Sequence, residues 1–240
     1  MLPLFFVPEI PAENFLTVEG DEAHHAIKVS RIEIGEEINL ADGYGNWARC
    51  RVDSFDKKSM VVTISERGTV TNLQPELVVV QALIKSDRSK EAVELLTVAG
   101  ADRIIPWQSE RSISQWKEDM GAKWLNSAIA AAKQSRRFIL PAIEEPIRTA
   151  DIGKRFGTHS LLLICHEGAE DHLSEILSRQ AENLREVVIV IGPEGGLSQN
   201  EVNIFLAAGG YPVRMGSTVL RSPHAGFAAL SAVQAILGRW

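Results

Sequence analysis

The sequence predicts an α/β protein in two parts: a small N-terminal β-barrel over residues 1–72, and a larger domain over residues 73–240 that contains a mostly parallel sheet. Two observations carry this prediction. The first 70 residues hold short strand-like runs separated by turn signals, a pattern typical of compact barrels. From Glu76 onward, strand-like and helix-like runs alternate, which is typical of a parallel sheet covered by helices.

The clearest turn signal of the N-terminal part is Asp42-Gly43-Tyr44-Gly45, which lies between strand-like runs at residues 37–40 and 47–52. Asp-Gly in this position predicts a β-hairpin. We also expect a strand at residues 60–64, a short helix at residues 23–30, and a linker at residues 69–75, where a polar stretch ends in proline.

In the second part, five consecutive β-branched residues, Val187–Ile191, predict a strand buried on both faces. The same alternating pattern predicts further strands at 77–84, 103–106, 161–165 and 213–215, and helices at 89–99, 116–137 (one long helix or two), 173–184, 198–208 and 226–237.

The composition narrows the class of protein. Apolar residues make up 45% of the 240 residues and charged residues 23%, the net charge is −6, and no apolar run has the length of a membrane span. Cys50 and Cys165 lie far apart, so we expect buried free thiols in a reducing cytoplasm. No Cys/His cluster has zinc-site spacing, so we expect no metal.

The most informative stretch follows the Val187–Ile191 strand. Gly192-Pro193-Glu194-Gly195-Gly196 is a loop with few side chains, and Ser198 and Glu201 have the spacing of a helix capping box. A strand, a loop with few side chains and the start of a helix, in this order, predict a ligand-binding crevice at the carboxyl end of a sheet. The loop lacks the glycine patterns of kinases and dinucleotide-binding dehydrogenases. It also lacks lysine, so a ligand with positive charge fits better than a polyphosphate; the alternative is a tight turn without a ligand.

Two further bare segments follow predicted strands. Residues 215–226 join a strand to a helix of small residues, and His166-Glu167-Gly168 follows the strand at residues 161–165. Because each segment comes after a strand, we expect the three loops to converge on one pocket.

These loops resemble the SPOUT class of methyltransferases, and most closely the RsmE-type family, which methylates N3 of a uridine in 16S ribosomal RNA. The residues that carry the resemblance are His166-Glu167, Ile191–Leu197 with Glu201, Met215-Gly216 and Leu220-Arg221, with support from residues 109–112 and 131–135. In the N-terminal part, His24-His25, Lys28-Val29, Arg31 and residues 35–45 resemble the family's RNA-binding barrel, so the resemblance covers nearly the whole chain.

The resemblance implies a PUA-like barrel followed by a SPOUT domain whose C-terminal chain forms a trefoil knot. It implies a homodimer that acts on the small ribosomal subunit and binds S-adenosylmethionine, whose cationic sulfonium suits a loop with a glutamate and no lysine. The residues that it assigns to the donor are His166, Glu167, Ile191, Gly192, Pro193, Glu194, Gly195, Gly196, Leu197, Met215, Gly216 and Leu220.

The sequence departs from the family after the Leu-Arg pair. The family carries a Thr-Glu-Thr-like run there, whereas this chain has Ser222-Pro223-His224 and so lacks a carboxylate. We expect Arg221 to stabilise the uridine anion, and Glu194 or His224 to accept the N3 proton. Two alternatives stay open: a salt bridge between Arg221 and Glu194, and a role for His224 in capping or packing the last helix.

Basic residues supply the candidate RNA contacts. Residues 73–140 hold 10 basic and 8 acidic side chains, against 7 and 12 in residues 1–72. Lys133, Arg136 and Arg137 have the spacing of one helix face, which predicts a phosphate track. The other candidates are Lys28, Arg31, Lys85, Arg88 and Arg111. For each of them the alternative is a solvated surface charge.

Two other functions stay open from the sequence. One is a SPOUT methyltransferase that acts on transfer RNA or on a ribose 2′-hydroxyl. The other is an RNA-binding ribosome-assembly factor with a vestigial donor pocket, for which the His224 departure leaves room.

Overall fold

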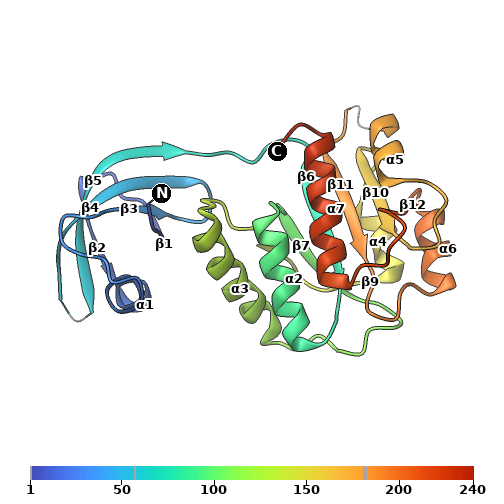
Figure 1. Cartoon of the computed structure of the whole chain (residues 1–240), viewed down its shortest axis with the longest axis horizontal. Coiled ribbons are helices and arrows are strands. Elements are labelled where there is room, and N and C mark those ends of the chain that lie inside the picture. The colour runs from blue at the N-terminus through green and yellow to red at the C-terminus, as the bar shows by residue number, and fades with distance from the viewer. Residues whose placement is uncertain (1, 57, 181–182) are drawn as a thin grey trace. The chain divides into compact units, whose positions relative to one another are not determined.

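The computed structural model describes residues 2–56, 58–180 and 183–240, and its contacts form two compact units (Figure 1). Unit 1 comprises Met1–Asn72 with Ala132–Leu140, and unit 2 comprises Leu73–Ala131 with Pro141–Trp240. The sequence prediction assigned all of residues 73–240 to the second part and did not include the excursion of residues 132–140 into unit 1.

Specific contacts hold this excursion in unit 1. The ring of Phe138 stacks on Trp47, with centroids 5.4 Å apart, and the Leu140 N–H donates to the Gly43 carbonyl at 2.9 Å. Gly43 has φ +82°, and a Cβ there would meet the Leu140 side chain at 2.9 Å. The predicted hairpin therefore also contacts residues 132–140, and no local sequence pattern indicates this contact.

Unit 1 contains a five-stranded sheet whose order is β1 (Leu4–Phe6), β3 (Glu37–Ala41), β4 (Asn46–Phe55), β5 (Ser59–Thr69), β2 (Phe15–Glu19). Only β1 and β3 pair in parallel; the other neighbours are antiparallel. Helix α1 (Gly20–His24) continues into a π-helical turn, η1 (His25–Val29), which confirms the short helix. The hairpin is also confirmed, because Asp42 Oδ1 accepts from the Tyr44 N–H at 2.7 Å and closes the turn between β3 and β4.

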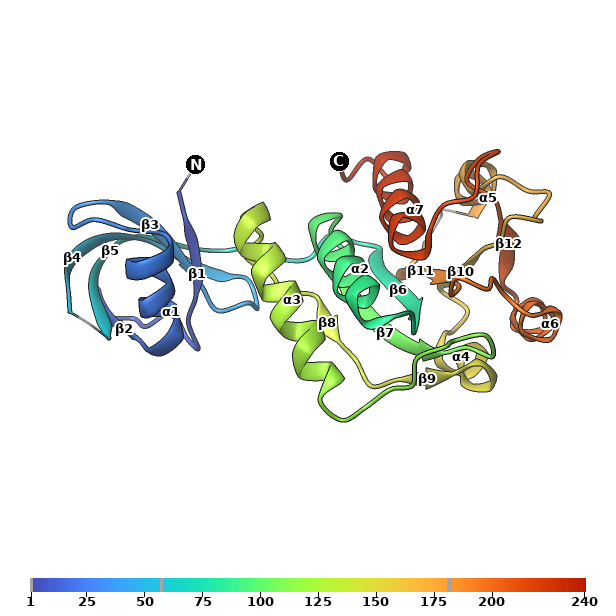
Figure 2. The same cartoon turned by 60° about the horizontal axis from the view of Figure 1, so that its bottom comes forward.

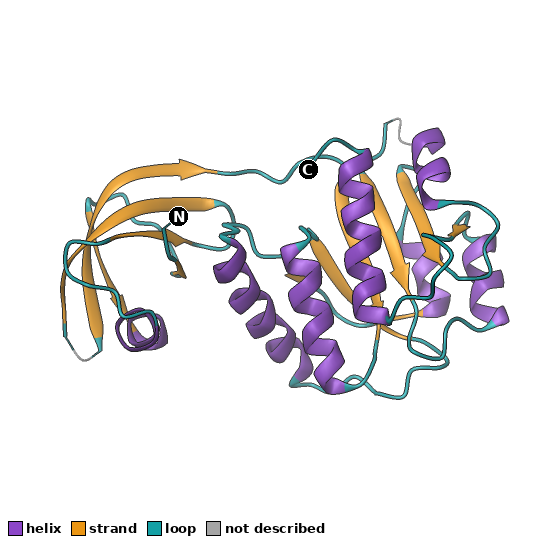
Figure 3. Cartoon of the chain, viewed as in Figure 1, coloured by secondary structure: helices purple, strands orange, loops and turns teal. Residues whose placement is uncertain are grey.

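Unit 2 contains a fully parallel sheet whose order is β12 (Tyr211–Val213), β10 (Ser160–Cys165), β11 (Glu186–Ile191), β6 (Glu76–Ala82), β7 (Arg103–Gln108), β8 (Ala142–Ile143), with β9 (Ile147–Arg148) also on β7. The helices that alternate with these strands are α2 (Ser86–Val98), α3 (Met120–Ser135), α4 (Thr149–Arg155), α5 (Leu173–Gln180) and α6 (Gln199–Ala207), and α7 (Ser222–Ile236) follows the last strand (Figure 3). The predicted alternation of strands and helices is confirmed.

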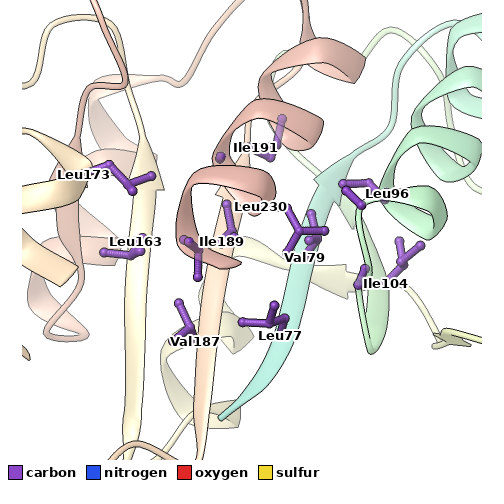
Figure 4. Close-up of a cluster of buried hydrophobic side chains, with 14 of the residues drawn as sticks. Leu77, Val79, Leu96, Ile104, Leu163, Leu173, Val187, Ile189, Ile191 and Leu230 are labelled. Carbon is purple, nitrogen blue, oxygen red and sulfur yellow. The ribbon is translucent and has the colours of Figure 1, made fainter. Parts of the chain in front are cut away.

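Both faces of this sheet are buried, which explains the unbroken apolar runs of its strands. On one face Leu77 and Val79 pack in a cluster with Leu96 of α2 and Leu230 of α7 (Figure 4). On the other face, alternate residues of the same strands pack against Phe205 of α6. Helices α2 and α7 lie side by side over the first face (Figure 2).

Several details differ from the sequence prediction. Strand β12 covers Tyr211–Val213 instead of residues 213–215, and α3 covers Met120–Ser135 instead of residues 116–137. Helix α7 begins at Ser222 instead of residue 226, because Pro223 is compatible with a helix's first turn. Strands β8 and β9 and helix α4 were not predicted, since each strand has two residues and leaves no periodic signal. In the described part of the chain, no helix combines the length and apolar character that crossing a membrane requires.

Candidate active site

A cleft of about 370 Å³ opens where β10, β11 and β12 end, and we call it the carboxyl-end cleft. The residues that line it are Arg88, Cys165–Glu167, Ile191–Glu194, Gly196, Leu197, Val213–Ser222 and Ala225. The three bare loops thus meet at one pocket. It brings together the residues that the sequence assigned to the donor, except Gly195, which lies outside the lining.

The register of the strands explains the convergence. Cys165 pairs with Ile191 on one side and with Val213 on the other, so all three strands end at the same level. The His166 N–H donates to the Val213 carbonyl at 3.0 Å. The residues that follow these strands must therefore emerge at one edge of the sheet, as expected for a crevice in an open α/β fold.

Within the glycine-rich loop (residues 192–196), the Gly196 N–H donates to the Pro193 carbonyl at 3.0 Å, and Gly196 has φ +68°. Arg111 Nη1 donates to the Gly195 carbonyl at 2.8 Å. Arg88 Nη1 lies 3.2 Å from Glu194 Oε1. Two arginines, Arg88 and Arg111, therefore hold the glycine-rich loop in place.

The salt bridge that was considered between Arg221 and Glu194 is absent, because Arg88 takes that carboxylate. Arg221 is exposed at the wall of the cleft, and it forms no ion pair within the described residues. Its guanidinium is therefore available to a ligand.

Glu201 has a larger role than the sequence predicted. The capping box with Ser198 is confirmed, and the carboxylate is fully buried. However, Oε1 of Glu201 also accepts from the Glu110 N–H at 2.8 Å and lies 3.4 Å from Thr149 Oγ1. Glu201 therefore does more than form the capping box with Ser198, because its second oxygen ties the loop after β7 to the start of α6.

Glu110 reinforces the same junction from the exposed side. Hydrogen bonds from Ser198 and from Asn200 hold the pKa of the Glu110 carboxyl below its ordinary value. The Asn200 Nδ2 donates to Glu110 Oε1 at 2.6 Å. The loop that carries Glu110 and Arg111 is therefore fixed against both α6 and the glycine-rich loop.

His224 does not reach the cleft, so the structure does not support it as the proton acceptor. Since α7 begins at Ser222, the side of its first turn that lines the cleft carries Ser222 and Ala225 instead. His224 Nε2 lies 3.8 Å from Glu91 Oε1 of α2. It does not cap α7 either, because the residue at that position is Arg221.

The phosphate track predicted from Lys133, Arg136 and Arg137 is not present as a helix face. Lys133 is largely buried and pairs with Glu22, and α3 ends at Ser135. Arg136 has φ +59° and donates to the Lys133 carbonyl. The spacing implied a helix that continues to Arg137, whereas the helix ends at Ser135, within the segment 132–140 that belongs to unit 1.

The remaining basic candidates are at or near the surface. Lys28, Arg31 and Lys85 are exposed, and Lys85 is the residue that precedes α2. Arg88 and Arg111 contact the glycine-rich loop as described above.

Sequence reasoning missed Gln81, a fully buried amide that bonds to Ser222 at the cleft. The signal was available, since Gln81 is the one polar side chain in the run Leu77–Ala82. Cys165, predicted to be a buried free thiol, is free and partly buried beside the cleft, and desolvation by the surrounding protein raises its pKa to about 12.

The lining of the cleft fits a ligand that carries an apolar ring and charged groups of both signs. Ile191, Leu197 and Met215 supply apolar wall. The charged lining residues are Glu167, Glu194, Arg88, Arg214 and Arg221. A Cβ on Gly216 would meet nothing within 4 Å, so the cleft is open there. The volume lies in the usual range of small-molecule sites.

Comparisons with known proteins agree with this geometry. A family model described as an RNA methyltransferase domain matches residues 71–234, and one described as an RNA methyltransferase PUA domain matches residues 18–65. Ribosomal RNA small subunit methyltransferase E of Mycobacterium bovis is 36% identical over 246 residues, which cover 99% of this chain and 93% of that protein. The protein of the same description from Bacillus subtilis is 26% identical, with coverage of 90% and 88%.

Two solved structures extend the likeness to the fold. Ribosomal RNA small subunit methyltransferase E from Neisseria gonorrhoeae, bound to S-adenosyl methionine, has a TM-score of 0.86 and 25% identity, and the match covers 98% of each chain. A probable rRNA-methyltransferase from Porphyromonas gingivalis has a TM-score of 0.83 and 27% identity, with 99% of each chain covered. The resemblance inferred from the sequence is confirmed, and the chain belongs to the ribosomal RNA small subunit methyltransferase E family.

Proposed function

We propose that this chain transfers a methyl group from S-adenosylmethionine to N3 of a uridine in the 16S RNA of the small ribosomal subunit. Membership of an RNA methyltransferase family supports the reaction class. The observation that carries the proposal is the convergence of residues 166–167, 191–197 and 215–221 on one cleft, where backbone groups and two carboxylates surround an open space.

S-adenosylmethionine, when bound, supplies an electrophilic methyl group on a cationic sulfur. The chain's part is to hold and orient this donor through the backbone of residues 192–194, 196 and 215–216, and through the carboxylates of Glu167 and Glu194. Arg88 and Arg111 fix the glycine-rich loop in place. Positioning of this kind can supply much of the rate of a direct displacement.

The uridine N3 must lose its proton before it can attack. Glu194 Oε1 accepts from Arg88, which leaves Oε2 without a partner in the described part of the chain. We assign the N3 proton to this oxygen: the N–H bond breaks first and its electron pair stays on N3. The resulting anion would then take the methyl group, and the donor sulfur would keep the electrons of the methyl–sulfur bond. Arg221 holds O2 or O4 of the base as negative charge develops there.

The test is Arg221→Ala, assayed on small ribosomal subunits with mapping of the methylated nucleoside. We expect turnover to fall roughly 100-fold or more, the typical cost of losing one charge-stabilising donor. Donor affinity, measured by calorimetry, should stay unchanged. Arg179→Ala, an exposed arginine on α5, is the control.

Near-normal turnover of Arg221→Ala would remove Arg221 from the mechanism. Methylation of transfer RNA or of a ribose hydroxyl would refute the choice of nucleotide. A wild-type protein that binds rRNA without binding the donor would establish the assembly-factor alternative.

We also propose RNA contacts at Lys28, Arg31, Lys85, Arg88 and Arg111. Arg88 pairs with Glu194, whereas the other four side chains form no ion pair among the described residues and can therefore contact phosphates. Such contacts require that affinity for the RNA falls steeply as salt is added. Affinity that is flat with salt would contradict them. Because the proposed substrate is ribosomal RNA, we place the protein in the cytoplasm.

We further propose that the chain acts as a homodimer and that residues 214–222 complete a trefoil knot. In support, Val219, Ile236 and Trp240 are apolar and exposed near the C-terminus, and burial against a second copy would cover them. Light scattering at micromolar concentration tests the dimer, and a monomer would contradict it. A solved donor complex of this chain, in which the path of residues 214–222 can be traced, tests the knot.

A further inference from the structure

Gln81 joins three segments of the carboxyl-end cleft through a series of hydrogen bonds. Its side chain is fully buried at the end of β6. Nε2 of Gln81 donates to the Ala82 carbonyl at 3.1 Å and to Ser222 Oγ at 2.9 Å. Ser222 Oγ donates in turn to the Gly192 carbonyl at 2.7 Å.

The chemistry of these groups fixes the direction of the series. Carbonyl oxygens only accept, so Gln81 must present its NH₂ group to Ala82 and to Ser222. With Ser222 Oγ already accepting, its single proton goes to the Gly192 carbonyl. The series has one low-energy arrangement and ends on the first residue of the glycine-rich loop.

The fold makes this a link between strands and helix. Gln81 pairs with Ile191 in the register of β6 and β11, so Gly192 is the next residue beyond the pair. Ser222 is the first residue of α7 and follows Arg221 directly. One buried amide thus holds the end of β6, the glycine-rich loop and the start of α7 together.

The amide is not the best choice for packing alone. Oε1 of Gln81 has no partner within the described residues, and it lies 3.5 Å from where a Cβ on Gly226 would be. A buried polar atom without a partner carries a desolvation penalty, which leucine would avoid at similar size. The other residues of β6 that face the sheet's core are apolar. A stability cost retained at a cleft points to a role beyond packing.

We propose that Gln81 is a positioning residue that acts through Ser222 to hold Arg221 at a fixed place relative to the glycine-rich loop. This inference rests on the proposed methyl transfer. Arg221 has no ion pair among the described residues, and its side chain makes no capping hydrogen bond. Its placement therefore depends on the residue that follows it. A displacement of about 1 Å at a reacting group can cost on the order of 100-fold in rate.

The experiment compares Gln81→Leu, Ser222→Ala and Ser222→Thr with the wild type, on small ribosomal subunits. Gln81→Leu removes the orphaned Oε1 together with the two hydrogen bonds from Nε2, so we expect its unfolding temperature to stay within about 3 °C of the wild type. Its kcat should fall roughly 10- to 100-fold, while the donor Kd changes by less than about threefold. Ser222→Ala should lose kcat similarly, and Ser222→Thr, which keeps a hydroxyl, should regain most of it.

A purely structural role predicts the opposite pattern, in which the unfolding temperature falls and kcat is preserved. An unchanged kcat in both folded Gln81→Leu and Ser222→Ala would overturn the inference. If the wild type itself failed to methylate the subunits, the proposed function would fall instead, so the two failures are distinguished.

Discussion

Replacement of Glu201 by glutamine tests the junction between the loop after β7 and helix α6. Both carboxylate oxygens of Glu201 accept from backbone N–H groups: Oε2 from Ser198 at 2.9 Å and Oε1 from Glu110 at 2.8 Å. Glutamine has the same shape with a single acceptor oxygen. In Glu201→Gln, one of the two N–H groups therefore faces an NH₂ group and loses its partner in a buried site.

The magnitude follows from these two bonds. A hydrogen bond to a charged group contributes about 1.5–3 kcal/mol, and a buried donor left unpaired costs a similar amount. We expect Glu201→Gln to lower the free energy of unfolding by about 2–3 kcal/mol. For a unit of this size that corresponds to a fall of roughly 5–10 °C in the unfolding temperature.

Thermal unfolding and urea titration measure the effect, and amide hydrogen exchange at Glu110 shows whether its N–H has lost protection. The control is Glu118→Gln, an exposed glutamate on the segment before α3, which should stay within about 0.5 kcal/mol of the wild type. If Glu201→Gln unfolds within about 1 °C of the wild type, the junction does not stabilise the fold.

Two further predictions concern titratable groups near the cleft. Desolvation raises the pKa of the Cys165 thiol to about 12. At pH 8 this thiol should therefore react with iodoacetamide about three orders of magnitude more slowly than an ordinary cysteine. A rate close to that of free cysteine would contradict the raised pKa. Hydrogen bonds from Ser198 and Asn200 lower the pKa of the Glu110 carboxyl in the folded state. The contact therefore stabilises the fold at pH values above the unfolded pKa of about 4.3, and this stabilisation is lost as the pH falls through the folded pKa. Asn200→Ala should raise the Glu110 pKa in an NMR titration, and an unchanged pKa would show that the hydrogen bond is not formed.

Local patterns in the sequence determined most of the architecture. The β-branched run Val187–Ile191 predicted a strand buried on both faces, the Asp42 turn predicted a hairpin, and Ser198 with Glu201 predicted a helix start, and all three are present. Each signal lies within a few residues, because backbone propensity and side-chain periodicity are local properties. The cleft was also predictable, since parallel strands end at a common edge.

Only the tertiary structure decided which charged and polar groups meet. Glu194 pairs with Arg88, 106 residues away, and not with Arg221. Lys133 pairs with Glu22 across 111 residues, which removes it from the surface, and Gln81 reaches Ser222 across 141 residues. Periodicity assigns a side chain to a face of its own element, but its partner depends on which other element packs there. That choice is made by the packing of the whole chain, and it separates the residues free to bind substrate from those that hold the fold.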